Sequence, residues 1–191
     1  MPYLPDSLKI TFFEALSGEK STGDFEQWVY TQTDLEAYLN SSDYLDLIST
    51  DFSSSASQQE LFELLHRQID AGEYETWRLN RLLRRFVNRE GNLPLMLCEF
   101  YDLYCRGFCF LKTLGLEYGL SIKVPPSEYS ADYWQDLSEA EKTKLLDSLL
   151  PGALEEAQKV LAWLEEGKIA IASTKNERGY PRYTDNRTDK S

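Results

Sequence analysis

The sequence predicts an all-α fold, a compact multi-helix bundle around one buried helix. Apolar residues recur at helical spacing along most of the chain, and capping residues stand before several of these segments. Residues 95–114 are apolar on nearly every side. Because a helix that is apolar all round must be enclosed by others, residues 95–114 are predicted to lie at the centre of the fold.

Four short amphipathic helices are predicted in the first 52 residues. The first covers residues 8–16, and Gly18 ends it. Ser21 and Thr33 are typical N-terminal caps for the second and third helices. The fourth covers residues 44–52, and the serine run that follows is predicted to be a loop.

The middle of the chain predicts two further helices before the buried one. Ser57 with Glu60 resembles a capping box, and that helix runs to Gly72. Residues 74–89 are strongly amphipathic, with leucines on one face and arginines on the other. Asn92 is predicted to cap the buried helix that follows.

The last third predicts two helices, a ribbon and a tail. Ser138 caps a helix that ends at Leu150, and Pro151 starts the last helix. Residues 120–124 and 169–172 are expected to pair as a short two-stranded ribbon. Residues 1–172 are thus predicted to be a single helical domain, and residues 173–191, which hold few aliphatic side chains, a flexible polar tail.

The charge is unevenly distributed. Residues 1–75 hold 15 acidic and three basic residues, a net charge that equals the −12 of the whole chain. Such a field repels phosphate backbones and attracts basic partners, so nucleic acid is an unfavourable partner and a basic protein a favourable one. A surface adapted only for solubility is the alternative interpretation.

The termini and the cysteines indicate a cytoplasmic protein. The first ten residues, MPYLPDSLKI, have neither the basic cluster nor the apolar run of a signal peptide, and no segment predicts a membrane span. The three cysteines, Cys98, Cys105 and Cys109, are an odd number and lie within one predicted helix. This is not the pattern of a secreted disulfide framework, and it suits a reducing compartment. We expect them to pack in the core.

No motif in the sequence predicts catalysis, a metal site or a cofactor. Patterns such as GxSxG, HExxH and GxxxxGK[ST] are absent, and the single histidine, His66, stands apart from the cysteines. A metal or cofactor is therefore not expected. An enzyme with an unrecognised carboxylate or tyrosine site stays open as an alternative.

Arginines recur along one face of the predicted helix 74–89. Arg78, Arg81, Arg85 and Arg89 follow spacings of three, four and four, which places them in one stripe. The stripe predicts either an anion-binding ridge or a polar face that docks on the protein's own acidic first third. The net charge favours docking, and a regulatory nucleic-acid-associated protein is the alternative.

Acidic and aromatic residues alternate between residues 19 and 46, a combination typical of a surface for a basic partner. The predicted partner-binding residues are Glu19, Asp24, Glu26, Trp28, Asp34, Glu36, Asp43 and Asp46.

Residues 12–52 also carry a resemblance. They read FFEALSGEKSTGDFEQWVYTQTDLEAYLNSSDYLDLISTDF, a short helix ending in S-G-E, then S-x-x-x-F-E-x-W-V-Y, then Y-L-D-L-I-S. This pattern is similar to the openings of small helical bacterial toxin-immunity proteins of the colicin-immunity kind. The resemblance implies an acidic helical protein that neutralises a basic toxin, often a nuclease, by covering it. It carries over no catalytic residue, because such inhibition requires none.

Overall fold

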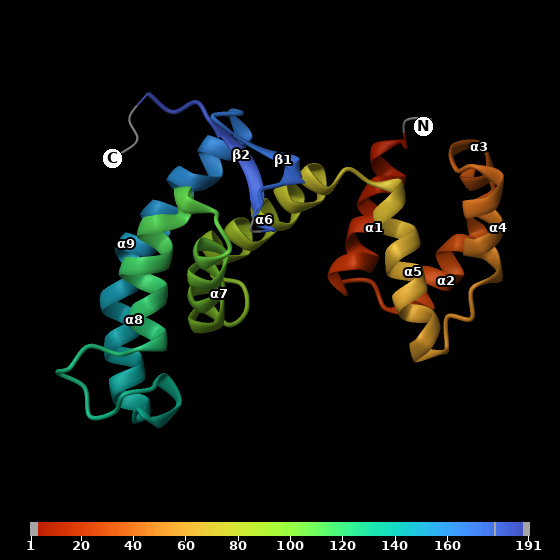
Figure 1. Cartoon of the computed structure of the whole chain (residues 1–191). Helices are drawn as coiled ribbons and strands as arrows, with labels where there is room; N and C mark the ends of the chain where they lie inside the picture. The colour runs from red at the N-terminus through yellow and green to blue at the C-terminus, as the bar shows by residue number, and fades with distance from the viewer. Residues whose placement is uncertain (1–3, 178, 189–191) are drawn as a thin grey trace. The chain divides into compact units, whose positions relative to one another are not determined.

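The computed structural model describes residues 4–177 and 179–188, without the side chains of residues 55 and 56. Residues 1–3, 178 and 189–191, which belong to the predicted domain and tail, lie outside the described residues. The described chain consists of helices and one antiparallel two-stranded ribbon (Figure 1). The all-α prediction is confirmed.

The chain divides into two compact units, residues 1–78 and 79–191, where the sequence predicts one domain. Each unit has a hydrophobic core of its own. Unit 1 contains α1 (Asp6–Ser17), α2 (Thr22–Thr31), α3 (Leu35–Tyr38), α4 (Ser41–Ser49), α5 (Ser55–Gln68) and the beginning of α6 (Ala71–Val87). Unit 2 contains the end of α6, α7 (Leu93–Cys105), the 3-10 helix η1 (Cys109–Leu111), the π-helix η2 (Thr113–Gly119), α8 (Leu120–Lys123), the 3-10 helix η3 (Trp134–Asp136), α9 (Glu139–Glu165), β1 (Ile169–Lys175) and β2 (Pro181–Asp185).

The core of unit 1 is built from large side chains of its five complete helices. Phe12, Phe25 and Leu65 are fully buried, and the rings of Phe12 and Phe25 meet edge to face with centroids 6.0 Å apart. Ser21 caps α2 by accepting a hydrogen bond from the backbone N–H of Asp24, as its sequence position predicts. Helix α5 packs beside α1 and α4 in this unit (Figure 1).

The predicted central helix 95–114 is interrupted. Its first part, α7, contributes Leu97 and Phe100 to the core of unit 2, but the helix ends at Cys105. Gly107 adopts a φ of 101°, and the N–H groups of Gly107 and Phe108 donate to the carbonyls of Tyr104 and Leu103. This hydrogen-bond pattern terminates a helix at a glycine. The continuous helix from residue 95 to 114 is therefore wrong, although its buried character is right for α7.

Two glycines, Gly115 and Gly119, mediate helix packing in unit 2. Gly115 lies inside the π-helix η2 and Gly119 at its end, and α8 continues directly from it. A Cβ at Gly115 would lie 2.8 Å from Cβ of Tyr104, and one at Gly119 would collide with the carbonyl oxygen of Leu97. The absence of side chains lets η2 pack closely on α7.

The predicted ribbon exists, but one of its strands is not the predicted one. Residues 120–123 form α8, and β1 pairs instead with β2, so that Ile171 lies opposite Tyr183. The predicted boundary at residue 172 falls inside β1, and β2 lies within the predicted tail. Tyr183 packs edge to face on Phe110 with ring centroids 5.0 Å apart, an apolar contact that fixes the ribbon to unit 2.

The predicted break before the last helix does not occur. Helix α9 runs from Glu139 to Glu165 with Pro151 in its interior. An interior proline costs a helix about 3 kcal/mol, and the buried Leu150, Ala153 and Ala157 on either side of it offset that cost. The capping box at Ser138 is confirmed, since its side chain and that of Glu141 bond reciprocally to the two backbone N–H groups.

Candidate protein-binding surface

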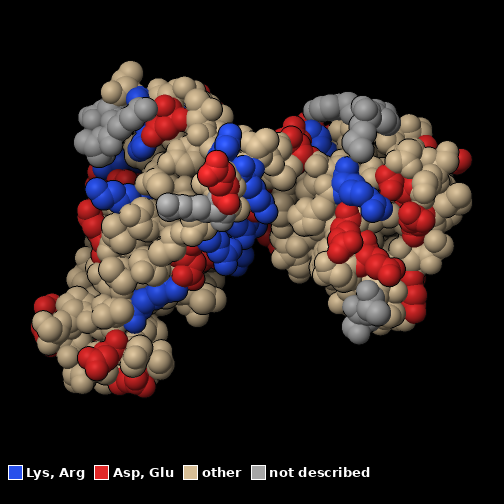
Figure 2. Space-filling view, viewed as in Figure 1, with Lys and Arg blue, Asp and Glu red and all other residues tan. Residues whose placement is uncertain are grey.

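The acidic imbalance of the chain coincides with unit 1. Residues 1–78 hold 15 acidic and four basic residues, a net charge of −11 out of −12 for the whole chain. Figure 2 shows acidic side chains gathered over and beside α5 on the visible face of this unit. A potential of one sign over a small unit attracts ligands of the opposite charge.

The structure separates the predicted partner-binding residues by their exposure. Five of the acidic side chains are exposed: Glu19, Asp24, Asp34, Glu36 and Asp46. Glu26 and Trp28 are half-buried, and Asp43 is buried. The exposed residues are spread along the sequence from the end of α1 to α4.

Asp43 joins two helices. Its carboxylate accepts hydrogen bonds from the side chains of Asn40, at 2.5 Å, Arg67, at 3.3 Å, and Gln68, at 2.6 Å. Arg67 and Gln68 belong to α5, so Asp43 connects α4 to α5. Because Asp43 is buried and three side chains of the protein donate to its carboxylate, its assignment to a partner surface is corrected to a structural role.

The predicted aromatic anchor, Trp28, belongs to the core. Its ring stacks on Phe25 with centroids 5.5 Å apart and meets Phe12 edge to face at 5.9 Å. Tyr30, two residues further on, is instead 60% exposed, and its hydroxyl donates to the carbonyl of Ile48 at 3.4 Å. Tyr30 is therefore the aromatic side chain that α2 presents to solvent beside the end of α4.

An acidic hollow lies between α4 and α5. Its volume is about 470 Å³, and four of its lining side chains are carboxylates: Asp46, Asp51, Glu60 and Glu63. Of these four, only Asp46 is among the predicted partner-binding residues. Glu60 and Glu63 are three positions apart in the sequence, a spacing that indicates one side of a helix, and both lie on one side of α5.

The hollow keeps most of its negative charge. Its one basic lining residue, Arg67, is paired with Asp43. The side chain and backbone N–H of Ser53 donate to Asp51 and hold its pKa below the usual value, so Asp51 stays ionised at neutral pH. Within the described residues, no ion pair or hydrogen bond engages the side-chain carboxylate of Asp46 or of Glu60. These carboxylates are available to a cation.

Among residues 4–177 and 179–188, no group of three or more histidine, cysteine, aspartate or glutamate side chains converges closely enough to hold a metal ion. The carboxylates are spread around an open depression. Such spacing suits the long, flexible cationic side chain of a lysine or arginine.

Docking of the arginine stripe on the protein's own acidic first third stays a prediction. Arg78 pairs with Glu75 one turn earlier on α6, and Arg84, beside the stripe, pairs with Glu165 of α9 at 2.7 Å. Arg81, Arg85 and Arg89 are exposed. An anion-binding role for the stripe stays a prediction.

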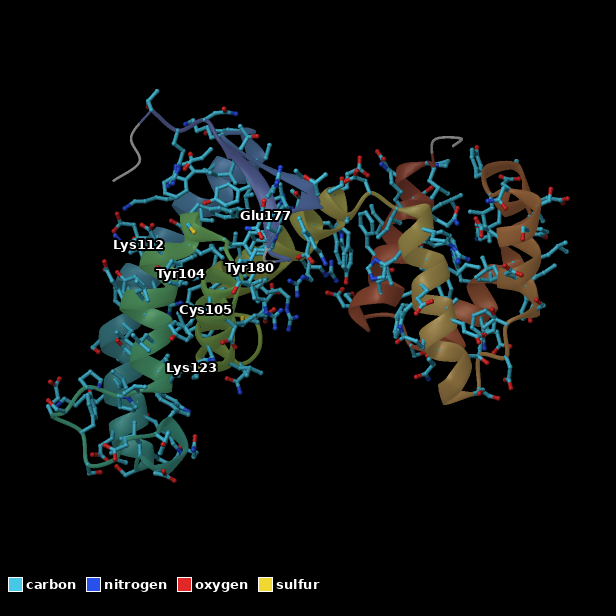
Figure 3. All side chains as sticks on the ribbon, in the orientation of Figure 1. Tyr104, Cys105, Lys112, Lys123, Glu177 and Tyr180 are labelled. Atoms are coloured by element: carbon cyan, nitrogen blue, oxygen red, sulfur yellow. The ribbon has the colours of Figure 1, made fainter. Side chains whose placement is uncertain are left out.

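Two of the cysteines are exposed, which corrects their predicted place in the core. Cys105 and Cys109 line an open hollow of about 600 Å³ at the end of α7, opposite the turn between β1 and β2. Figure 3 labels four of its lining residues: Tyr104 and Cys105 from the end of α7, and Glu177 and Tyr180 from between β1 and β2. Only Cys98 is half-buried. The early end of α7 brings the other two thiols to the surface, which a continuous helix could not predict.

Comparisons with protein-family models, with curated proteins and with solved structures found no match for this chain. Over the part of the chain that the structure describes, no helix combines the length and apolar character needed to cross a membrane.

Proposed function

We propose that unit 1 binds a basic protein through α5 and the acidic hollow beside it. The observation that carries this proposal is the group of four carboxylates around one depression, with the only basic lining residue engaged by Asp43. A lysine or arginine side chain entering the hollow would exchange water for several charge-assisted hydrogen bonds. The remaining charge of unit 1 would steer the partner and raise its association rate.

The resemblance to toxin-immunity proteins specifies what this partner would be. A basic toxin, in many cases a nuclease, carries the positive surface that an acidic unit attracts. The protein would neutralise the toxin by covering it, and no catalytic residue of its own would be needed. Residues 46 and 51 of the hollow fall inside the segment of resemblance, residues 12–52.

The proposed location is the cytoplasm. Cys105 and Cys109 are exposed free thiols. Accessible thiols persist in a reducing compartment and are oxidised or paired in secreted proteins. The exposed cysteines therefore support this location.

Affinity capture from the native cell tests the proposal. The bait variant Asp46→Lys with Glu60→Lys reverses two carboxylates that have no ion pair to lose, so the fold should be kept. We expect wild-type bait to recover a basic protein that this variant does not recover. Binding should weaken as salt rises, because screening shortens the reach of charge to about 8 Å at physiological ionic strength.

A variant with the same change in net charge is the control. Asp34 and Glu36 are exposed acids of unit 1 outside the hollow. Asp34→Lys with Glu36→Lys should still recover the partner. If the two double variants recover it equally well, the hollow is not the binding site, and the acidic surface serves solubility alone.

A further inference from the structure

A second hollow lies on the opposite flank of α5 and is mostly apolar. The end of α1, the beginning of α2 and α5 enclose it. Its apolar lining consists of Ala15, Phe25, Leu61, Phe62 and Leu65, with Gly18, Lys20, Ser21, Thr22 and Gln58 completing the wall. Phe62 is 37% exposed, an unusual position for a phenylalanine.

From this arrangement we propose that the apolar hollow is a socket for one apolar side chain of the same basic partner. The inference rests on the proposed function, and it adds the chemistry of the recognised segment. That segment carries a lysine or arginine for the acidic hollow and a leucine, isoleucine, methionine or phenylalanine for the socket.

The size of the socket matches one side chain. Its volume is about 160 Å³. An apolar cavity of about 150 Å³ accommodates one benzene molecule, which is close to the size of a phenylalanine ring. The socket therefore takes a single large apolar side chain and excludes a second one.

The positions along α5 place the two hollows on separate flanks of one helix. Gln58, Leu61, Phe62 and Leu65 line the socket. Ser57, Glu60, Glu63, Leu64 and Arg67 line the acidic hollow. Each set follows helical spacing, so each forms a stripe along its own side of α5.

The width of α5 sets the spacing between the two side chains of the partner. A helix with its side chains is about 10–12 Å across. An extended chain advances about 3.3 Å per residue. The cationic and apolar residues of an extended partner segment therefore stand about three or four positions apart.

The charges around the socket favour a basic partner over a second copy of this chain. The one basic lining residue, Lys20, is paired with Glu14 at 3.6 Å. Unit 1 of a second copy would bring the same net charge of −11 and be repelled. A basic segment meets opposite charge on one flank of α5 and an apolar surface on the other.

Two synthetic peptides test the socket with the full chain. Both are short and lysine-rich, and both have one variable position about three residues from the nearest lysine, occupied by leucine in one and by serine in the other. Fluorescence anisotropy of the labelled peptides measures both affinities. We expect the leucine peptide to bind about tenfold tighter, the effect of burying most of one leucine side chain.

Matched variants assign the difference to the socket. Ala15→Leu fills the socket. Phe62→Ser removes part of its wall at an exposed position and should keep the fold even if Ala15→Leu does not. Either variant should abolish the advantage of leucine and leave the affinity of the serine peptide unchanged. Asp46→Lys with Glu60→Lys should weaken both peptides equally.

The outcomes separate the socket from the proposed function. Equal binding of the two peptides to the wild type overturns the socket and leaves the acidic hollow intact. Failure of both peptides to bind contradicts the proposed function as well. Sedimentation of the protein alone tests a second copy as the occupant. Self-association that Phe62→Ser abolishes would show that a second copy occupies the socket, and it would overturn the inference.

Discussion

The guanidinium of Arg67 lies 3.3 Å from Oδ1 of Asp43, and this pair joins α5 to α4 at the edge of the acidic hollow. The pairing has two consequences. It makes Asp43 a structural residue, and it engages Arg67, the basic residue among those described that line the hollow. Asp43 thus stabilises the protein, whereas the proposed binding depends on other acids, one of which, Asp46, lies on the same helix.

Replacing Asp43 should destabilise the protein. Asp43→Ala leaves the donors of Asn40, Arg67 and Gln68 without their acceptor, and we expect a loss of about 1–3 kcal/mol in the free energy of unfolding. Asp46→Ala, an exposed change on the same helix, should shift it by less than about 0.5 kcal/mol. Urea denaturation measures both, and equal effects would contradict the structural role of Asp43.

Replacing Gly119 should also be destabilising, because a methyl group there meets the backbone of Leu97. We expect Gly119→Ala to cost about 1–3 kcal/mol. Gly23 in α2 has open space around its Cβ position, so Gly23→Ala should stabilise the protein by a few tenths of a kcal/mol to about 1 kcal/mol. Thermal unfolding should show changes in stability of opposite sign for the two variants. A Gly119→Ala variant as stable as the wild type would show that η2 tolerates a wider spacing from α7.

These glycines illustrate what the sequence could predict about the fold and what it could not. Local signals such as the caps at Ser21, Asn92 and Ser138 predicted helix starts, because each depends on a side chain and a backbone N–H three residues away. Pro151 was wrongly predicted to be a helix boundary, and the packing role of Gly119 was not predicted, since both depend on packing between distant segments. The partner of β1 also depends on a distant contact, that of Tyr183 with Phe110.

The same limit applies to the candidate site. The charge pattern predicted the acidic part of the chain and Asp46. It could not distinguish Asp43, which is buried by partners 24 and 25 residues away, from exposed acids nearby. It also could not bring Glu60 and Glu63 together with Asp51, because that requires α4 and α5 to pack side by side.

The cysteines should react with a thiol reagent in two classes. Cys105 and Cys109 are exposed and should be labelled rapidly, whereas burial raises the pKa of the Cys98 thiol and should make it slow. Stopped-flow labelling of the native protein should show two fast equivalents and one slow one. The variant Cys105→Ser with Cys109→Ser should lose the fast phase only, and a fast phase that survives would contradict the exposure of these two residues.

The start of α9 should be sensitive to acid. Hydrogen bonds from Ser138 and Ser130 lower the pKa of Glu141 from 4.5 to about 2. The folded state favours the charged Glu141 carboxylate more than the unfolded state does. The contribution of this charge to stability is therefore present above pH 4.5 and is lost as pH falls towards 2. Glu141→Gln should therefore be less stable than the wild type at neutral pH, and the difference should shrink between pH 4.5 and 2.

The matched control for Glu141 is Glu139→Gln, in the same first turn of α9 but outside the capping box. We expect a smaller effect from it at neutral pH. A difference between the wild type and Glu141→Gln that stays constant down to pH 2 would contradict the assigned role of the Glu141 charge.

The central claim is that the acidic hollow of unit 1 binds cationic side chains, and residue-resolved NMR of the ¹⁵N-labelled protein with a short oligolysine peptide tests it most directly. The account predicts that the largest shift changes fall on the residues around the hollow, residues 46–51 and 57–67, and that Asp46→Lys with Glu60→Lys removes them. Shift changes spread evenly over the acidic residues of both units, and unaffected by that variant, would contradict it.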